Sequence, residues 1–364
     1  MWLGAALLST VAPCEPRVTP APSAPLELAN VPALVQGRAM RVTDHNENSV
    51  RFQWPGVYFQ TRFKGRSVYF RTGAGNVILR AFVDGEPIGA LVKPARGLYL
   101  IEGLAGGTHT VRLEAITESE TGTVDFGGFA LPPGSKPLPL KPHALQMEFI
   151  GDSHTVGYGN TSHSRDCTED EVWATTDTSQ AFGPKIARHY GADYQINAIS
   201  GRGIVRNYDG SDGDPLPVAY PLTLPDQAAR YHDSHWQPRI IVIALGTNDF
   251  STPLNPREKW KSREDLHADF EATYLRFIEG LRAHNPGAFI ILWATDLAER
   301  EIQVEANKVV EQMQAKGEAR IAFVPIDGLA MEGCHWHPSV ADHDAIAEKL
   351  IRFIEGRHLA SAAP

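Results

Sequence analysis

Four short clusters hold the residues whose types could do covalent chemistry. Their sequences are Gly-Asp-Ser-His-Thr at 151–155, Ser-Gly-Arg-Gly at 200–203, Gly-Thr-Asn-Asp at 246–249 and Cys-His-Trp-His-Pro at 334–338. A serine hydroxyl is a weak nucleophile until a neighbouring base takes its proton, and histidine has the pKa suited to that step near neutral pH. We therefore predict Ser153 as a nucleophile and His337 as its base.

The same clusters offer donors for the negative oxygen that forms when an ester is attacked. Such an oxyanion needs preorganised N–H groups, and we expect them from the backbone of Ser153 and Gly201 and from the side-chain amide of Asn248. At Gly201 the absent side chain lets the backbone approach a substrate. The neighbouring Asp152 and Asp249 are predicted to organise turns rather than to take protons.

The elements that must position these clusters alternate between strands and helices. Strands are predicted at 145–150, 193–199, 239–245, 289–294 and 321–325, and helices at 179–190, 265–284, 301–315 and 343–354. This alternation predicts a parallel sheet covered by helices on both faces. Three clusters directly follow strands, and in such sheets reactive groups gather at the carboxyl edge.

The first third of the chain has the alternating apolar and polar pattern of β-strands and no segment with helical spacing. Runs at 49–54, 57–63, 67–72, 77–83, 98–102 and 108–114 alternate as strands do, and Asp84-Gly85 is a hairpin turn signal. They predict a β-sandwich or jelly roll. A proline-rich connector follows, which cannot continue a central strand. We expect a leader at 1–30, a sandwich at 31–130, the connector at 131–143 and an α/β domain at 144–364.

Composition limits the partners. The net charge of −9 over 364 residues argues against a general affinity for nucleic acid or anionic membranes, and a neutral substrate fits better. The apolar run at the N-terminus has the length of a signal-peptide core and is too short to span a bilayer. We expect a secreted or periplasmic protein, with a lipoprotein at Cys14 as a variant and a cytoplasmic leader as the alternative.

The four clusters, in this order, resemble those of the SGNH, or GDSL-like, hydrolase superfamily. Its name stands for the serine, glycine, asparagine and histidine that here would be Ser153, Gly201, Asn248 and His337. The resemblance implies a flavodoxin-like, three-layer α/β/α domain. The Gly-x-Ser-x-Gly elbow of the α/β-hydrolases is absent around Ser153, which argues against that fold.

Longer motifs are similar to carbohydrate esterase family 2. They are Phe-Ile-Gly-Asp-Ser at 149–153, Gly-Tyr-Gly-Asn at 157–160, Trp-His-Pro-Ser at 336–339 and Phe-x-Trp-Pro-Gly at 52–56. The resemblance implies an N-terminal jelly roll and removal of O-acetyl groups from xylan or glucomannan, without a cofactor, through an acetyl-enzyme on Ser153. The alternatives are a lipase or thioesterase for longer acyl chains, and an inactive glycan-binding protein.

The chain departs from the superfamily where an aspartate usually orients the base. The positions two and three residues before His337 are His335 and Cys334. We expect a backbone carbonyl to hold the Nδ1–H of His337, because orientation of the imidazole is all that is required. The alternatives are a carboxylate from Glu332 or Asp342, a bridge through His335 to a more distant acid, or a dead site.

Cysteines and aromatic residues complete the predicted site. With Cys14 in the leader, Cys167 and Cys334 are left as one possible disulfide, conditional on export, with two separate buried thiols as the alternative. Trp293 and Trp336 are predicted to stack on sugar rings, whereas Phe250 is expected to be core. No metal is expected, because the spacing of the histidines matches no ligand pattern. The sandwich is expected to be structural and to shape one wall of the cleft.

Overall fold

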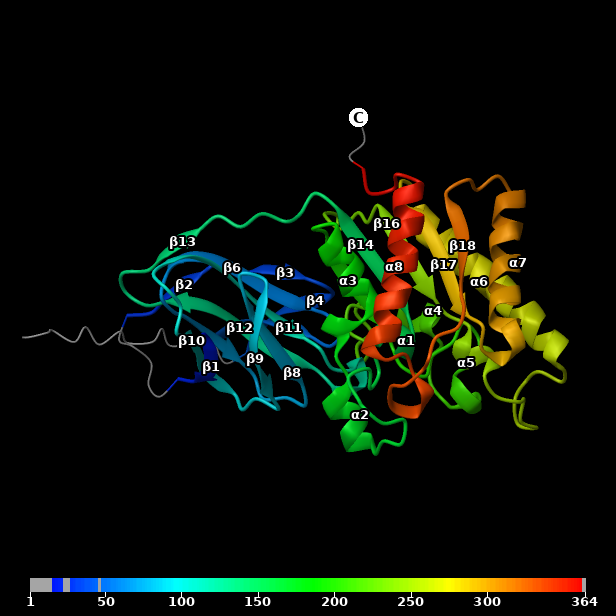
Figure 1. Cartoon of the computed structure of the whole chain (residues 1–364), viewed down its shortest axis with the longest axis horizontal. Helices are drawn as coiled ribbons and strands as arrows, with labels where there is room; N and C mark the ends of the chain where they lie inside the picture. Colours follow the sequence, from blue (N-terminus) through cyan, green and yellow to red (C-terminus); the bar gives the residue numbers. More distant parts are fainter. Residues whose placement is uncertain (1–14, 22–26, 45–46, 362–364) are drawn as a thin grey trace, which may run out of the picture.

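A computed structural model describes residues 15–21, 27–44 and 47–361. The chain forms two domains side by side, an all-β domain followed by an α/β domain (Figure 1). Cys14 and most of the expected leader lie outside the described residues. Within those residues, no helix combines the length and the hydropathy needed to cross a bilayer.

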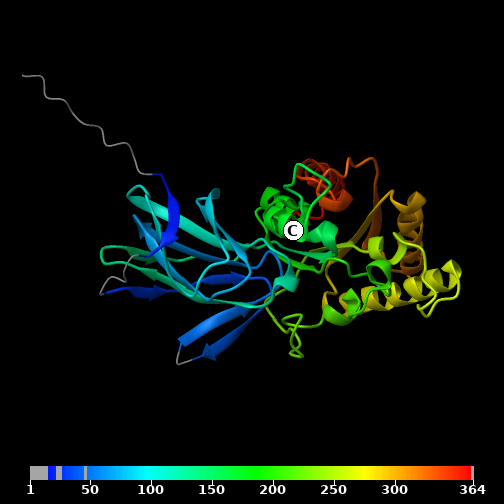
Figure 2. The same ribbon diagram turned by 90° about the horizontal axis from the view of Figure 1, so that it is seen from below.

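The N-terminal domain is a sandwich of two antiparallel sheets, as predicted (Figure 2). The seven-stranded sheet has the order β1-β10-β7-β12-β5-β4, with β2 paired to β12. Its strands are β1 (Arg17–Pro20), β2 (Ala29–Val31), β4 (Ala39–Asp44), β5 (Glu47–Phe52), β7 (Val68–Thr72), β10 (Gly97–Glu102) and β12 (Val124–Leu131). The six-stranded sheet has the order β13-β6-β11-β8-β9, with β3 paired to β6. Its strands are β3 (Leu34–Gln36), β6 (Tyr58–Gly65), β8 (Ile78–Val83), β9 (Glu86–Val92), β11 (Gly107–Ala115) and β13 (Lys136–Leu138).

Aromatic side chains fill the space between these sheets. Phe59 of β6 stacks on Phe126 of β12 with ring centroids 4.0 Å apart, and Phe126 meets Phe129 edge-to-face at 5.0 Å. Asp84 and Gly85 both have positive φ and join β8 to β9, which is the two-residue hairpin turn that their sequence predicts.

The sandwich extends beyond the boundaries expected for it. Strand β1 pairs with β10 and β2 pairs with β12, so part of the expected leader at 1–30 belongs to the fold. The expected connector at 131–143 contains β13, which pairs with β6. This strand tolerates Pro137 because it lies at the edge of its sheet.

The C-terminal domain has a parallel sheet of order β15-β14-β16-β17-β18, with helices on both faces, as predicted (Figure 1). Its strands are β14 (Gln146–Gly151), β15 (Asp193–Ala198), β16 (Ile240–Ala244), β17 (Phe289–Thr295) and β18 (Ile321–Ile326). Helices α3 and α8 contact each other in the hydrophobic layer on one face, and α6 and α7 share the layer on the other. The helices are α1 (Ser153–Val156), α2 (Glu169–Thr175), α3 (Phe182–His189), α4 (Leu216–Ala219), α5 (Thr247–Phe250), α6 (Arg263–His284), α7 (Glu301–Ala315) and α8 (Val340–Gly356).

The strand order brings the clusters together. Strand β14 lies between β15 and β16, and all three run parallel, so the segments that follow them meet at one edge. The sandwich packs against the same domain through buried polar contacts: the Tyr58 hydroxyl donates to Asp193 Oδ1 at 2.8 Å, and Trp54 Nε1 donates to the Thr223 carbonyl at 3.0 Å. The two domains therefore share an interface with specific hydrogen bonds.

Candidate active site

Ser153 is the first residue of α1, directly after β14. The Asp152 side chain caps this helix by accepting the His154 N–H at 3.0 Å, and Gly157 ends it in the left-handed conformation at φ 84°. This strand–turn–helix places the Ser153 hydroxyl at the carboxyl edge of the sheet. The side chain is mostly buried, with 5% of its surface exposed.

His337 lies within proton-transfer distance of that hydroxyl. The distance from His337 Nε2 to Ser153 Oγ is 2.9 Å. On the other side of the ring, Nδ1 lies 3.0 Å from the carbonyl oxygen of Cys334 and 3.2 Å from that of His335. Carbonyl oxygens only accept hydrogen bonds, so the proton of the neutral ring belongs on Nδ1 and the Nε2 lone pair faces the hydroxyl.

A backbone carbonyl thus takes the orienting role of the missing aspartate, and none of the other candidates bonds the His337 ring among the described residues. The Asp342 carboxylate accepts the N–H groups of Ala330 and Met331 at 2.7 and 3.0 Å. The His335 ring bonds the Tyr158 hydroxyl at 2.9 Å and the Cys167 carbonyl at 2.7 Å, so it does not bridge His337 to an acid. Glu332 is exposed and has no contact with His337 among the described residues.

Burial sets the protonation state of the base. Desolvation lowers the pKa of His337 to about 4, although the carbonyls of Cys334 and His335 favour the charged ring. The Tyr158 ring covers the imidazole with its centroid 4.3 Å away and the planes 30° apart. Sequence reasoning assigned Tyr158 no role, and its position between two glycines was the available signal. At neutral pH His337 is therefore an uncharged acceptor.

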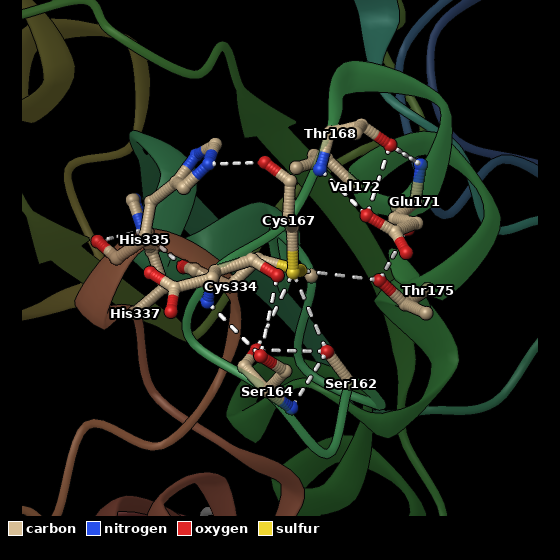
Figure 3. Close-up of a disulfide and its surroundings, with 12 residues drawn as sticks. Ser162, Ser164, Cys167, Thr168, Glu171, Val172, Thr175, Cys334, His335 and His337 are labelled. Atoms are coloured by element: carbon tan, nitrogen blue, oxygen red, sulfur yellow. Dashed lines mark hydrogen bonds between the residues drawn. A yellow bond between two sulfur atoms is a disulfide. The ribbon is translucent and has the colours of Figure 1, made fainter.

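A disulfide joins Cys167 to Cys334 (Figure 3). It links the segment before α2 to the loop that carries the histidine, and the Cα atoms of the two cysteines are 5.5 Å apart. The Cys334 N–H also donates to the Gly159 carbonyl at 3.2 Å. A Cβ at Gly159 would overlap the Cβ and Sγ of Cys334, so only glycine allows this approach.

Ser153 and Gly201, the two backbone donors expected for an oxyanion, both have an N–H group without a partner among the described residues. Gly201 has φ 76°, and a Cβ there would meet no atom within 4 Å. The left-handed backbone, rather than crowding, requires glycine here, and the open space leaves room for a substrate.

Asn248 connects the first two clusters. Its amide donates to Asp152 Oδ2 at 3.1 Å and to the Arg202 carbonyl at 2.9 Å. Both amide hydrogens therefore have protein acceptors in this structure, which differs from the simple expectation of a spare donor. A bound oxyanion would have to share or replace one of them.

The two aspartates organise the loops around these donors, in the way the sequence suggests. Asp249 accepts the backbone N–H groups of Ile204, Val205 and Arg206, each at 2.9 Å. Burial raises the pKa of Asp249 to about 6 and that of Asp152 to about 7.

The residues predicted to stack on sugar rings, Trp336 and Trp293, differ in their exposure. Trp336 is exposed over 64% of its surface next to His337, with the Arg165 guanidinium 3.9 Å from its ring. Trp293 is only 1% exposed, and it packs edge-on against Phe182 of α3 at 5.1 Å. Stacking of Trp293 on a sugar is therefore a wrong prediction, because β17 is covered on both faces. Phe250 is core, as predicted.

Metal ligands do not gather at this site. Over residues 15–21, 27–44 and 47–361, no three His, Cys, Asp or Glu side chains group as they would around an ion. The clusters are joined by the contact of Ser153 with His337 and by the hydrogen bonds of Asn248 to Asp152 and Arg202.

Two family models match the chain. Residues 39–140 match the model described as carbohydrate esterase 2 N-terminal, and residues 149–351 match the GDSL-like lipase/acylhydrolase family. An acetylxylan esterase / glucomannan deacetylase of Cellvibrio japonicus is 45% identical over 327 residues, covering 89% of this chain and 91% of the relative. The cellulase/esterase CelE of Acetivibrio thermocellus is 32% identical over 85% of this chain and 38% of its own length.

Solved structures agree with these matches. A carbohydrate esterase whose active site is described as having divergent catalytic and non-catalytic binding functions superposes with a TM-score of 0.85 at 42% identity, over 90% of this chain and 98% of its own. A family two carbohydrate esterase from Clostridium thermocellum in complex with cellohexaose gives 0.80 at 29% identity, over 90% and 100%.

Proposed function

Because the chain belongs to the GDSL-like lipase/acylhydrolase family and carries the carbohydrate esterase 2 N-terminal domain, we propose that it is a serine esterase that removes O-acetyl groups from polysaccharide. Acetylxylan and acetylated glucomannan are the substrate classes that its relative from Cellvibrio japonicus supports. The observation that carries the proposal is the 2.9 Å contact between Ser153 Oγ and His337 Nε2. The backbone N–H groups of Ser153 and Gly201, which have no acceptor among the described residues, support it.

Besides the acetylated substrate and a water molecule, the proposed reaction uses only the side chains and backbone groups of the site. The Ser153 hydroxyl gives its proton to His337 Nε2 as Oγ bonds to the acetyl carbon, and the carbonyl oxygen becomes an oxyanion facing the N–H groups of Ser153 and Gly201. His337 then protonates the departing sugar oxygen and leaves an acetyl group on Ser153. A water molecule, deprotonated by His337, releases acetate and restores the hydroxyl.

The carbonyl oxygens of Cys334 and His335 take the orienting part of the missing aspartate. They fix the ring tautomer through Nδ1–H, although they carry no full charge to stabilise the imidazolium. The Cys167–Cys334 disulfide supports the further proposal that the protein works outside the reducing cytosol, in a secreted or periplasmic setting.

The decisive experiment is acetate release from acetylated xylan and acetylated glucomannan by the wild type and Ser153→Ala. Loss of the nucleophile is expected to lower kcat by about 10⁴-fold or more. Ser234→Ala, on an exposed loop of the same domain, is the matched control and should keep full activity.

Aryl acetate and aryl octanoate then separate the alternatives. Preference for octanoate would overturn the deacetylase proposal in favour of a long-chain esterase. Glycan binding with no acetate release by the wild type would indicate an inactive binding protein.

A further inference from the structure

The turn after β11 belongs to the sandwich, and its Glu118 side chain contacts the α/β domain at the carboxyl edge of the parallel sheet. The turn begins at Ile116, whose carbonyl accepts the backbone N–H and the hydroxyl of Thr178 at 3.1 and 3.2 Å. Two residues later, Glu118 Oε1 accepts the hydroxyl of Ser200 at 2.6 Å. Ser200 immediately precedes Gly201. The sandwich therefore contacts the chain at the residue before a candidate oxyanion donor.

The Gly201 loop is held by contacts from both domains. Within the α/β domain, the Ile199 N–H donates to the Gly151 carbonyl at 3.2 Å. After Gly201, the loop is fixed by Tyr208 N–H, which donates to the Gly201 carbonyl at 2.8 Å, and by the Asn248 amide, which donates to Arg202. Before Gly201, the Ser200 side chain bonds only Glu118 in the described part of the chain. We propose that Glu118 is a positioning residue that sets the direction of the Gly201 N–H through Ser200.

The chemistry of Glu118 favours a functional reason for its presence. Its Oε2 is buried and has no hydrogen-bond partner within the described residues. Burial raises the pKa of its carboxyl group to about 7. A buried carboxyl group with one unsatisfied oxygen costs folding free energy, so a merely structural contact would be better served by a neutral side chain. The neighbouring Glu120–Arg202 pair, at 3.6 Å, is too exposed to replace it.

This proposal rests on the proposed esterase function, because it assigns a purpose to the Gly201 N–H. It makes the sandwich a part of the active site, since the residue that orients one donor belongs to the other domain. A shift of about an ångström in a catalytic group can cost about 10² in rate, so the effect of losing this contact should be large.

The first test compares Glu118→Ala, Glu118→Gln and Ser200→Ala with aryl acetate as substrate. Glu118→Ala and Ser200→Ala are each expected to lower kcat by about tenfold or more, with KM changed by less than about twofold. Glu118→Gln keeps an oxygen that accepts the Ser200 hydroxyl, so its kcat should stay within about threefold of the wild type. The double variant should be no slower than the worse single variant, because both remove one contact.

Tyr58→Phe is the matched control. It removes the hydrogen bond from the Tyr58 hydroxyl to Asp193, which is another contact between the domains. Asp193 begins strand β15, whereas Ser200 lies just after the other end of this strand. It should leave kcat unchanged. Hydrogen exchange of the amides at 199–203 supplies a readout independent of activity, and exchange should become faster in Glu118→Ala and Ser200→Ala but not in Tyr58→Phe.

Wild-type kcat and wild-type exchange at 199–203 in Glu118→Ala would overturn the proposal. So would multiplicative losses in the double variant, or an equal loss of kcat in Tyr58→Phe. If Glu118→Ala does not fold, Ser200→Ala and Glu118→Gln decide by the same two readouts. If the wild type releases no acetate, the proposed function fails, whereas the exchange of 199–203 still decides whether Glu118 holds the loop.

Discussion

Cys334 holds the base through two different atoms. Its carbonyl oxygen lies 3.0 Å from His337 Nδ1, and its sulfur is bonded to Cys167. The residue that stands where the superfamily has an aspartate therefore supplies both the hydrogen-bond acceptor and a covalent anchor for the loop. A peptide carbonyl has no side-chain freedom, so its position is only as fixed as the backbone around it.

Cys167→Ser should consequently lower kcat while leaving the acceptor in place. Losing the anchor at Cys334 lets the loop shift, and a fall of about ten- to a hundredfold is expected. The free energy of unfolding should fall by about 2–4 kcal/mol, the usual contribution of a disulfide. Aryl acetate kinetics and urea unfolding measure the two effects.

Reduction provides the control for this prediction. Wild type treated with dithiothreitol should behave like Cys167→Ser, and the reductant should not affect the variant further. Both proteins should carry Cys14→Ser, which removes the third thiol. A Cys167→Ser variant with wild-type kcat would show that the disulfide does not position His337.

The kcat/KM of the wild type should fall on the acid side only at an unusually low pH. Only neutral His337 can accept the Ser153 proton, and burial lowers its pKa to about 4. On the acid side, kcat/KM should therefore stay level through pH 5 to 6 and fall as the pH drops through about 4. An acid limb centred near pH 6.5 would contradict this assignment.

This measurement requires a check on folding. Burial also lowers the pKa of His154 and lowers that of His343 to about 3. The unfolded chain binds these protons more readily than the folded chain, so stability decreases as the pH falls below about 6.5. Circular dichroism that keeps its pH 7 signal while kcat/KM falls would separate titration of His337 from acid unfolding.

Much of the α/β domain could be predicted because strands alternate with helices along it, and some of the strands are continuous apolar runs. The segment 239–245 is an example, since a strand buried on both faces needs apolar residues at every position. The sandwich was harder. Strand β12 contains Gly127 and Gly128, and its pairing with β7 shifts register between Phe126 and Phe129, which breaks the alternation that would reveal it.

Some features of the candidate site could also be predicted from the sequence, and others could not. The residue types of the clusters, and their order, which resembles that of the superfamily, were sufficient to predict Ser153 and His337 as a pair. The burial of Trp293 follows from a sheet covered on both faces, but the helix residue that covers it, Phe182, could not be identified from the sequence. Glu118 gave no signal either, because its partner Ser200 lies 82 residues away and only the domain interface brings them together.

Trp336 should contribute to binding of polymer and not to the chemical step. Its ring is largely exposed beside His337, where it could cover one face of a sugar. Trp336→Ala is expected to raise KM for acetylated xylan by about fivefold, equivalent to about 1 kcal/mol of stacking, and to leave kcat for aryl acetate within about twofold. Trp336→Phe keeps an aromatic ring, so its KM for acetylated xylan should lie between those of the wild type and Trp336→Ala. An equal loss on both substrates would mean that Trp336 instead supports the His337 loop.

Gly159 tests whether the close approach of Cys334 matters for the base. In Gly159→Ala the new Cβ would overlap Cys334, so the loop must shift, and kcat should fall by about tenfold or more. Gly191→Ala is a matched control because Gly191 has nearly the same φ, 57° against 55°, but faces open space. Both variants should lose about 1 kcal/mol of stability from the left-handed backbone. Only Gly159→Ala should lose activity, and an equal loss in Gly191→Ala would mean that backbone strain alone, not contact with Cys334, accounts for it.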